Sequence, residues 1–190
     1  MDNENRLSVL ISSYKELFSV RQMALCAMML ALSVVLGRFS IYLTPSIKIS
    51  VAYLPFALAG MYAGPFAAML VGALNDLIGV LLFPAGTPFF GYTLTAALTG
   101  LTFGVFFYQK QPKLWTIILA RLIIVVFWHM CLNTYWSSIL MGDSFIVLFP
   151  ARALKSLIQY PIDILLLYLL LRFAARVRPP AGSGTKRQNS

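Results

Sequence analysis

The chain has 190 residues, of which 59% are hydrophobic and 11% are charged, and its formal net charge at pH 7 is +9. A soluble domain of this size cannot bury so much apolar surface, so the composition excludes a soluble globular protein and predicts an integral membrane protein. In a soluble protein the positive charge would suggest nucleic acid, but here the bases flank apolar runs, a pattern that orients a chain in a bilayer.

The first 21 residues precede the first long apolar run. Within them, Leu7, Leu10, Ile11, Tyr14, Leu17 and Phe18 recur at spacings typical of a helix. This periodicity predicts an amphipathic helix on the cytoplasmic membrane surface, with a frayed tail as the alternative. The apolar run that follows has no small-residue cleavage site, so we expect a retained helix and not a signal peptide.

Six apolar segments follow, and about 20 apolar residues suffice to span a bilayer. We expect them at residues 22–37, 49–63, 65–83, 90–108, 114–132 and 150–173. The second is short and contains Pro55, and Gly64-Pro65 predicts a tight turn into the third. Residues 174–190 are rich in Gly, Ser and Pro, which predicts a disordered cytoplasmic tail. The expected fold is therefore an all-α membrane domain over 22–173, with a terminal segment on either side.

The distribution of Lys and Arg predicts the orientation of this domain. If both ends lie in the cytoplasm, ten of these residues lie inside, four lie outside, and one is within a span. This excess favours an N-in, C-in topology. Four bases, Arg38, Lys48, Arg152 and Lys155, lie outside, although Lys and Arg are usually enriched on the cytoplasmic side. They form either a rim that meets the carboxylates of an anionic ligand or a snorkelling rim that contacts lipid phosphate.

Three charged residues, Asp76, Arg121 and Asp163, lie within predicted spans. A charge at mid-membrane costs at least ~2.5–3.5 kcal/mol, so each is expected to face protein or water and to have a partner. Counting residues places Arg121 and Asp163 at depths that differ by only ~5 Å at a rise of ~1.5 Å per residue. We therefore predict a structural ion pair between them. Asp76 lies nearer the outer end of its span, either as a structural acid or as an acceptor for the N–H groups of a ligand ring.

Polar and aromatic residues gather at the outer ends of the fourth and fifth spans. His129, Asn133 and Trp136 recur at spacings of four and three, which puts them on one face of an α-helix. Asn can pair with the edge of a heteroaromatic ring and Trp can stack on its face. Phe89 and Tyr92 begin the fourth span, as a pocket wall or as an interfacial aromatic belt. These residues predict an outward pocket for a flat heteroaromatic ligand with an acidic tail.

No catalytic motif stands out in the chain. It has no His-Glu-x-x-His and no GxxxxGK[ST] phosphate loop, so we expect no enzyme activity, no metal and no cofactor. Six spans in 190 residues are also few for a secondary transporter built from two repeats. The pattern favours a binding subunit that takes its energy from other chains.

The chain resembles the substrate-binding S components of energy-coupling factor (ECF) vitamin transporters, and within them the folate family. The segments that carry the resemblance are LSVVLGRFSIYLTPSIKISVAYLPFALAGMYAGP (32–65), VGALNDLIGVLLFPAGTPFFGYTLTAALTGL (71–101) and NTYWSSILMG…FPARALKSLIQYPIDILLL (133–167). The first span contains Ala27-Met-Met-Leu-Ala31, with Ala24 one turn earlier, which resembles the AxxxA docking motif of the family. Small residues four apart let helices approach closely.

The resemblance implies a six-span, N-in, C-in protein of a prokaryotic cell membrane. Such a protein binds folate or a related pterin and docks on a T subunit that works with two ATPase subunits. The pterin would lie against His129, Asn133 and Trp136, with the glutamate tail toward the bases. Two alternatives stay open: an S component for another vitamin, such as pantothenate or a flavin, and a structural membrane subunit that binds only proteins or lipid.

Overall fold

The structure is a computed structural model that describes residues 19–38, 41–44, 47–82, 89–111, 113–141 and 145–177. For 41–44, 47–49, 141, 145–152, 154 and 155 it describes the backbone alone. The predicted surface helix over 1–21 and the predicted tail over 174–190 lie almost wholly outside the described residues.

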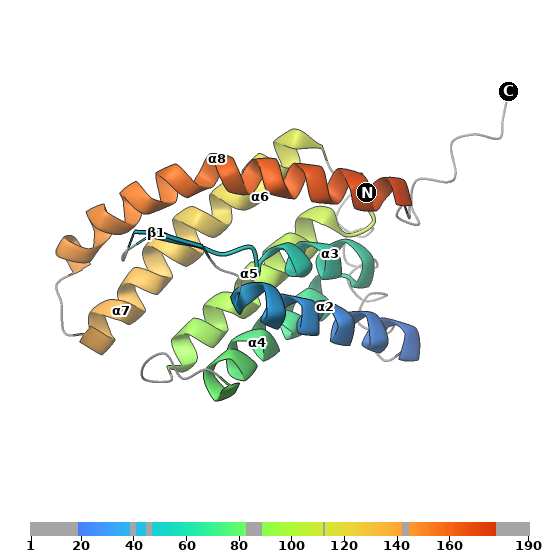
Figure 1. Cartoon of the computed structure of the whole chain (residues 1–190), viewed down its shortest axis with the longest axis horizontal. Helices are drawn as coiled ribbons and strands as arrows, with labels where there is room; N and C mark the ends of the chain where they lie inside the picture. The colour runs from blue at the N-terminus through green and yellow to red at the C-terminus, as the bar shows by residue number, and fades with distance from the viewer. Residues whose placement is uncertain are drawn as a thin grey trace, which may run out of the picture.

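The described chain is a bundle of helices with one β-hairpin (Figure 1). The helical segments are α2 (Val20–Arg38), α3 (Leu54–Ala63), α4 (Pro65–Leu82), α5 (Phe90–Phe107), α6 (Leu114–Ile123), the π-helix η1 (Ile124–Leu132), α7 (Asn133–Met141) and α8 (Phe145–Val177). The long α8 lies along one side of the bundle and packs on α6 and α7, while α2 packs on α3 and α4 at the other side (Figure 1).

Five helical stretches of the described chain are long and apolar enough to cross a membrane: Val20–Arg38, Pro65–Leu82, Phe90–Phe107, Leu114–Leu140 and Ser156–Val177. The shorter α3 is the sixth apolar helix. The fifth span was expected to end at residue 132, yet the helix runs on through the polar NTYWSS segment. It can do so because Thr134 and Ser137 are fully buried against neighbouring helices. The last helix extends to Val177 and so includes the first four residues of the predicted tail.

The all-α prediction is wrong in one place, between α2 and α3. Strands β1 (Ile41–Thr44) and β2 (Ile47–Ile49) pair antiparallel, with Ile41 opposite Ile49 and Tyr42 opposite Lys48. Both runs are rich in β-branched and aromatic residues, which favour strands, and Pro45 between them disfavours a continuous helix. The predicted second span, 49–63, accordingly begins as a helix only at Leu54.

The predicted turn at Gly64-Pro65 is confirmed. Helix α3 ends at Ala63 and α4 begins at Pro65, and Gly64 between them has a φ of 96°. This left-handed conformation is readily adopted only by glycine. The single-residue connection folds α4 back against α3.

The two ends of the bundle differ in how they are filled. At the end that holds the α3–α4 turn and the α5–α6 connection, Met61, Phe103, Phe107, Ile117 and Leu171 are at most 2% exposed. The Tyr62 hydroxyl ties α3 to α8 there by donating to the Ala174 carbonyl at 2.7 Å. Polar side chains such as Thr95 and Ser137 are buried toward the other end. The apolar core therefore seals one end of the bundle, and a polar interior is left near the other.

Helices α4 and α5 approach closely through glycines. A Cβ atom at Gly100 would collide with the carbonyl oxygen of Ala68, and one at Gly72 would collide with that of Ala96. Both obstacles are backbone atoms of the facing helix, so neither can move aside without shifting that helix. Small residues at such contacts let membrane helices pack backbone to backbone.

We expect Gly100→Ala to destabilise the protein by about 1–3 kcal/mol, as overpacking of a close contact does. Gly79→Ala on α4 is the matched control, because a Cβ there meets no atom within 4 Å. Thermal unfolding in detergent should show a lower midpoint for Gly100→Ala alone. Equal midpoints for the two variants would mean that the α4–α5 contact tolerates a methyl group.

Candidate functional site

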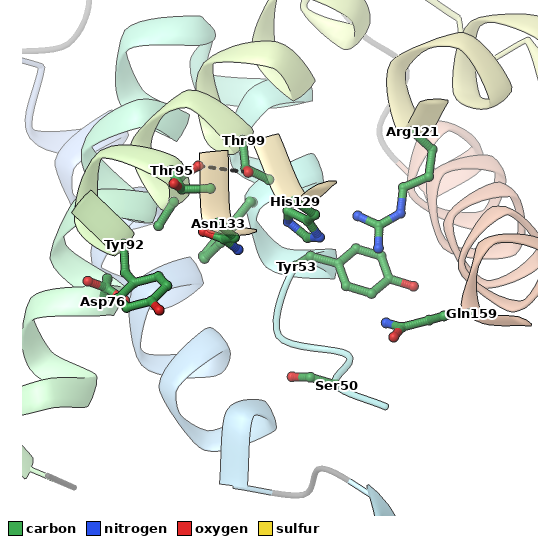
Figure 2. A pocket seen from close by; sticks show the side chains of 12 residues that line it. Ser50, Tyr53, Asp76, Tyr92, Thr95, Thr99, Arg121, His129, Asn133 and Gln159 are labelled. Atoms are coloured by element: carbon green, nitrogen blue, oxygen red, sulfur yellow. Dashed lines mark hydrogen bonds between the residues drawn. The ribbon is translucent and has the colours of Figure 1, made fainter. Parts of the chain in front are cut away.

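A cavity of about 330 Å³ lies in the polar part of the bundle (Figure 2). Its lining residues come from every helical segment of the described chain except α2. They are Ser50, Tyr53, Phe56, Asp76, Tyr92, Thr95, Ala96, Thr99, Arg121, His129, Asn133 and Gln159. Four of them, Asp76, Tyr92, His129 and Asn133, are residues that the sequence assigns to a pocket.

The lining has two chemically different ends. Figure 2 shows Asp76 and Tyr92 at one end and Arg121 and Gln159 at the other, with His129 and Asn133 between them. One end therefore carries an acid and the other a base. A ligand that spans the cavity meets a hydrogen-bond acceptor at the first end and a set of donors at the second.

Hydrogen bonds from the neighbouring helices hold the acidic end in place. The Thr93 hydroxyl donates to Asp76 Oδ2 at 2.7 Å, and the Tyr92 hydroxyl is 2.7 Å from the Ser137 hydroxyl. A carboxylate has about four lone-pair sites, so the bond from Thr93 orients Asp76 and leaves it able to accept from a ligand. The Tyr92 contact fixes the ring beside it.

His129 lies within the π-helix η1, which ends at Leu132, one residue before Asn133. In η1 the backbone N–H of Asn133 donates to the carbonyl of Trp128, five residues back, instead of four as in an α-helix. Each turn therefore holds more residues, and the α-helical spacing of 129, 133 and 136 does not keep all three on one face. The structure brings His129 and Asn133 to the cavity but does not bring Trp136 there.

Trp136 and Phe89, both predicted pocket residues, instead pack on each other beside the cavity. Their ring centroids are 5.5 Å apart, and Phe89 also meets Tyr92 edge-on at 6.2 Å. Gly91 lets the rings approach, because a Cβ there would lie 2.5 Å from both. Phe89 thus supports Tyr92, Trp136 packs against Phe89, and neither ring lines the cavity.

Arg121 and Asp163, which the depth count pairs, form an ion pair between Arg121 Nη2 and Asp163 Oδ2. Their exposed fractions are only 2% and 1%. The Arg121 Cζ atom also lies 4.4 Å from the centre of the Tyr53 ring, within range of a cation–π interaction. Sequence reasoning gave Arg121 a structural role alone and missed that its side chain lines the cavity.

The hydroxyl-rich face of α5 was also missed. Thr95 and Thr99 line the cavity, and their hydroxyls donate to the carbonyls of Gly91 and Thr95 at 3.0 and 2.8 Å. The four-residue spacing of these threonines in an otherwise apolar span is a signal that could have found them. Tyr53, Ser50 and Gln159 carry no such pattern, because they reach the cavity from two separate elements.

The predicted basic rim is only partly within the described residues. Arg38 is the last residue of α2, is exposed, and does not line the cavity. Lys48 lies in β2, and Arg152 and Lys155 lie in the first third of α8, but their side chains are outside the described part of the chain.

The residues of the AxxxA pattern lie on an open face of α2. Ala24, Ala27 and Ala31 are all exposed, and Ser33 is the only residue of this helix that is buried within the described chain. The Ser33 hydroxyl donates to the Ala52 carbonyl at 2.8 Å and attaches α2 to the start of α3. Helix α2 is thus the least covered of the long helices.

The chain is similar to a known family and to named proteins within it. A family model for "ECF transporter, substrate-specific component" matches residues 21–171. A protein of Clostridium novyi (strain NT) named "Folate transporter FolT" is 39% identical over 149 residues, which cover 78% of this chain and 87% of that protein. A "Folate transporter FolT" of Leuconostoc mesenteroides is 29% identical over 157 residues, or 80% and 84% of the two chains.

A solved structure is also similar to this chain. It is described as "Crystal structure of FolT bound with folic acid" and superposes with a TM-score of 0.74 at 35% sequence identity. The match covers 80% of this chain and 93% of that one.

Proposed function

The chain belongs to the folate family of substrate-specific components of ECF transporters, and from this membership we propose that it is a folate-binding membrane subunit. It captures folate or a related pterin from outside the cell. A T subunit and two ATPase subunits, supplied by other chains, drive its transport. The chain itself performs no chemistry on the ligand.

Beside the family membership, the observation in the structure that supports folate binding most is the cavity with its two polar ends. Ligand pockets typically enclose about 300–1,000 Å³ and place a few polar groups among apolar walls. The cavity of about 330 Å³ suits a fused heteroaromatic ring, with Asp76 as an acceptor for ring N–H and amino groups. Asn133 adds an amide between the two ends, and the rest of the ligand leaves toward the bases Arg38, Lys48, Arg152 and Lys155.

The membrane arrangement follows from the apolar helices and from the distribution of Lys and Arg. The five long apolar helices and the shorter α3 act as six spans with both ends in the cytoplasm of a prokaryotic cell. In this orientation the cavity lies in the outer half, because the α5–α6 connection and the end of α8, with their bases, lie inside. The exposed alanines of α2 then form the docking face for the T subunit.

Titration of the purified protein with three vitamins tests the proposal. Folic acid should quench tryptophan fluorescence saturably at submicromolar concentration, while pantothenate and riboflavin should leave it unchanged. A response to riboflavin or pantothenate but not to folic acid would assign the protein to another vitamin. No response to any of the three would favour a subunit that binds only proteins or lipid.

Asn133→Ala should weaken folic acid binding by about 1–3 kcal/mol, or roughly tenfold to over a hundredfold. Within the described chain, Asn133 Oδ1 is buried and has no hydrogen-bond partner, so it is available to a ligand donor. Asn75→Ala is the matched control, because Asn75 Oδ1 is also buried and unpaired among the described residues but Asn75 does not line the cavity. Isothermal titration of both variants measures the difference. Equal losses would mean that Asn133 acts through the fold and not through the ligand.

A further inference from the structure

We propose that Arg121 is a ligand-binding residue as well as the ion-pair partner of Asp163. Its remaining N–H donors bind an acceptor edge of the heteroaromatic ring, a ring carbonyl oxygen above all, at the end of the cavity opposite Asp76. This inference rests on the proposed function and deepens it, because it names the polarity of the ring that the cavity accepts.

Arg121 has more N–H donors than its ion pair uses. A guanidinium has five N–H donors, and the contact with Asp163 uses Nη2. Nε and Nη1 are both buried and have no hydrogen-bond partner in the described part of the chain. Buried donors without partners are costly and rare in proteins, so a group with two of them beside a cavity is a candidate for ligand binding.

Two contacts fix the orientation of the Arg121 guanidinium. Asp163 holds one side of the guanidinium, and the Tyr53 ring holds its face at 4.4 Å. Figure 2 shows the guanidinium above Tyr53, pointing from α6 toward the part of the cavity where His129 lies. Tyr53 and Arg121 both line the cavity. A donor group held by two contacts pays little conformational entropy on binding, so it is preorganised for an acceptor.

The charge of Arg121 is balanced within the protein. Arg121 is neutralised by Asp163, so it offers directional donors without presenting a net charge to the ligand. A carboxylate is therefore not required as its partner, and a neutral carbonyl oxygen or ring nitrogen is sufficient. Arginine makes this kind of contact with guanine, where it donates to a carbonyl oxygen and the adjacent ring nitrogen. The oxo-pterin ring carries the same pair of acceptors next to each other.

The two ends of the cavity together define a selectivity. Asp76 accepts from the amino and N–H groups of the ring, and Arg121 donates to its carbonyl edge. A ring with an amino group in place of that carbonyl presents a donor to a donor. A site built to hydrogen-bond one group strongly rejects an analogue that lacks it. The cavity should therefore prefer 4-oxo-pteridines to their 4-amino counterparts.

The test compares folic acid with aminopterin, its 4-amino analogue, by titration of the wild type and three variants. The wild type should bind folic acid at least ~10-fold more tightly than aminopterin. Arg121→Lys keeps a positive charge for Asp163 but loses the planar donor set, so this ratio should fall to about threefold or less. Asp163→Asn keeps the arginine, so it should weaken both ligands and leave the ratio above ~10.

The double variant Arg121→Leu with Asp163→Leu gives an independent route, because it removes the donors without leaving a buried charge unpaired. Its ratio should fall as in Arg121→Lys, and thermal unfolding identifies which variants are folded. A ratio that stays near the wild-type value in either folded Arg121 variant would overturn the proposal. A wild type that binds neither ligand would instead refute the proposed function, and one that binds both equally would refute only the role of Arg121.

Discussion

Arg121→Ala is expected to destabilise the protein by about 3–5 kcal/mol, because it leaves the Asp163 carboxylate buried without its partner. Asp163 is 1% exposed, and its Oδ1 atom already has no hydrogen-bond partner among the described residues. Loss of the Nη2 contact would remove the main compensation for burying this charge. Thermal unfolding in detergent, followed by circular dichroism, measures the effect.

The double change Arg121→Leu with Asp163→Leu should recover much of that stability, because apolar side chains of similar size replace a buried ion pair at little cost. Arg172→Ala is the control for loss of a guanidinium alone, since Arg172 is exposed and contacts Tyr168 on its own helix at 2.7 Å. That variant should lose less than about 1 kcal/mol. A double variant no more stable than the sum of the two single changes would contradict the interpretation of the pair.

The double variant also separates the two roles of Arg121. Its stability should recover, whereas its preference for the 4-oxo ring should not, because the donors that face the cavity are absent in both the single and the double change. A purely structural arginine would lose and regain both properties together. Stability and ligand selectivity therefore report on different N–H groups of one side chain.

The sequence allowed the ion pair to be predicted because depth in a membrane can be counted along a helix. Two opposite charges at equal depth in an apolar medium have few partners other than each other. The same count could not show that Arg121 also lines the cavity, since that depends on which way α6 turns relative to α3 and α8. The proximity of Tyr53, at the start of another helix, is a tertiary fact that spacing along α6 does not contain.

Of the three residues that α-helical spacing groups, His129 and Asn133 line the cavity and Trp136 packs on Phe89 beside it. The prediction assumed α-helical spacing, and nothing in IVVFWHMCL marks a π-helix, whose wider turns redistribute the faces. Trp136, which follows η1, is therefore rotated about the helix axis relative to His129, compared with its position in a continuous α-helix. The hairpin at Ile41–Ile49 was also missed, because the prediction treated the run between the first two spans as an outer loop, and only the pairing of its two halves shows that they are strands.

The Gly64-Pro65 turn could be predicted from local sequence, whereas the close α4–α5 contact could not. A glycine at positive φ followed by a proline at the first position of a helix has one common solution, a tight reversal. The collision predicted for a Cβ at Gly100, in contrast, depends on the carbonyl of Ala68 on the facing helix. This turn could be predicted from neighbouring residues in the chain, but the residue that each small side chain faces on another helix could not.

Tryptophan at both Ala27 and Ala31 is expected to abolish ATP-driven folate uptake while leaving folate binding to the isolated subunit intact. Both alanines are exposed on α2, which does not contribute to the cavity, so the bulky rings should not disturb the ligand. They would, however, hold a partner helix away from the α2 backbone, and small residues at such a face exist to permit close approach.

The measurement pairs folic acid titration of the purified subunit with uptake in cells or vesicles that contain the T and ATPase subunits. Leu165→Trp on α8 is the control, because it adds similar bulk at an exposed apolar position of a helix that does not carry the alanines. Uptake should persist in the control and fall below about a tenth of the wild-type rate in the double tryptophan variant, since separating closely packed helices removes the contacts that hold them together. Persistent uptake with tryptophan at both sites would place the docking face on another helix, because a flat interface cannot accommodate two indole rings without separating the backbones that it joins.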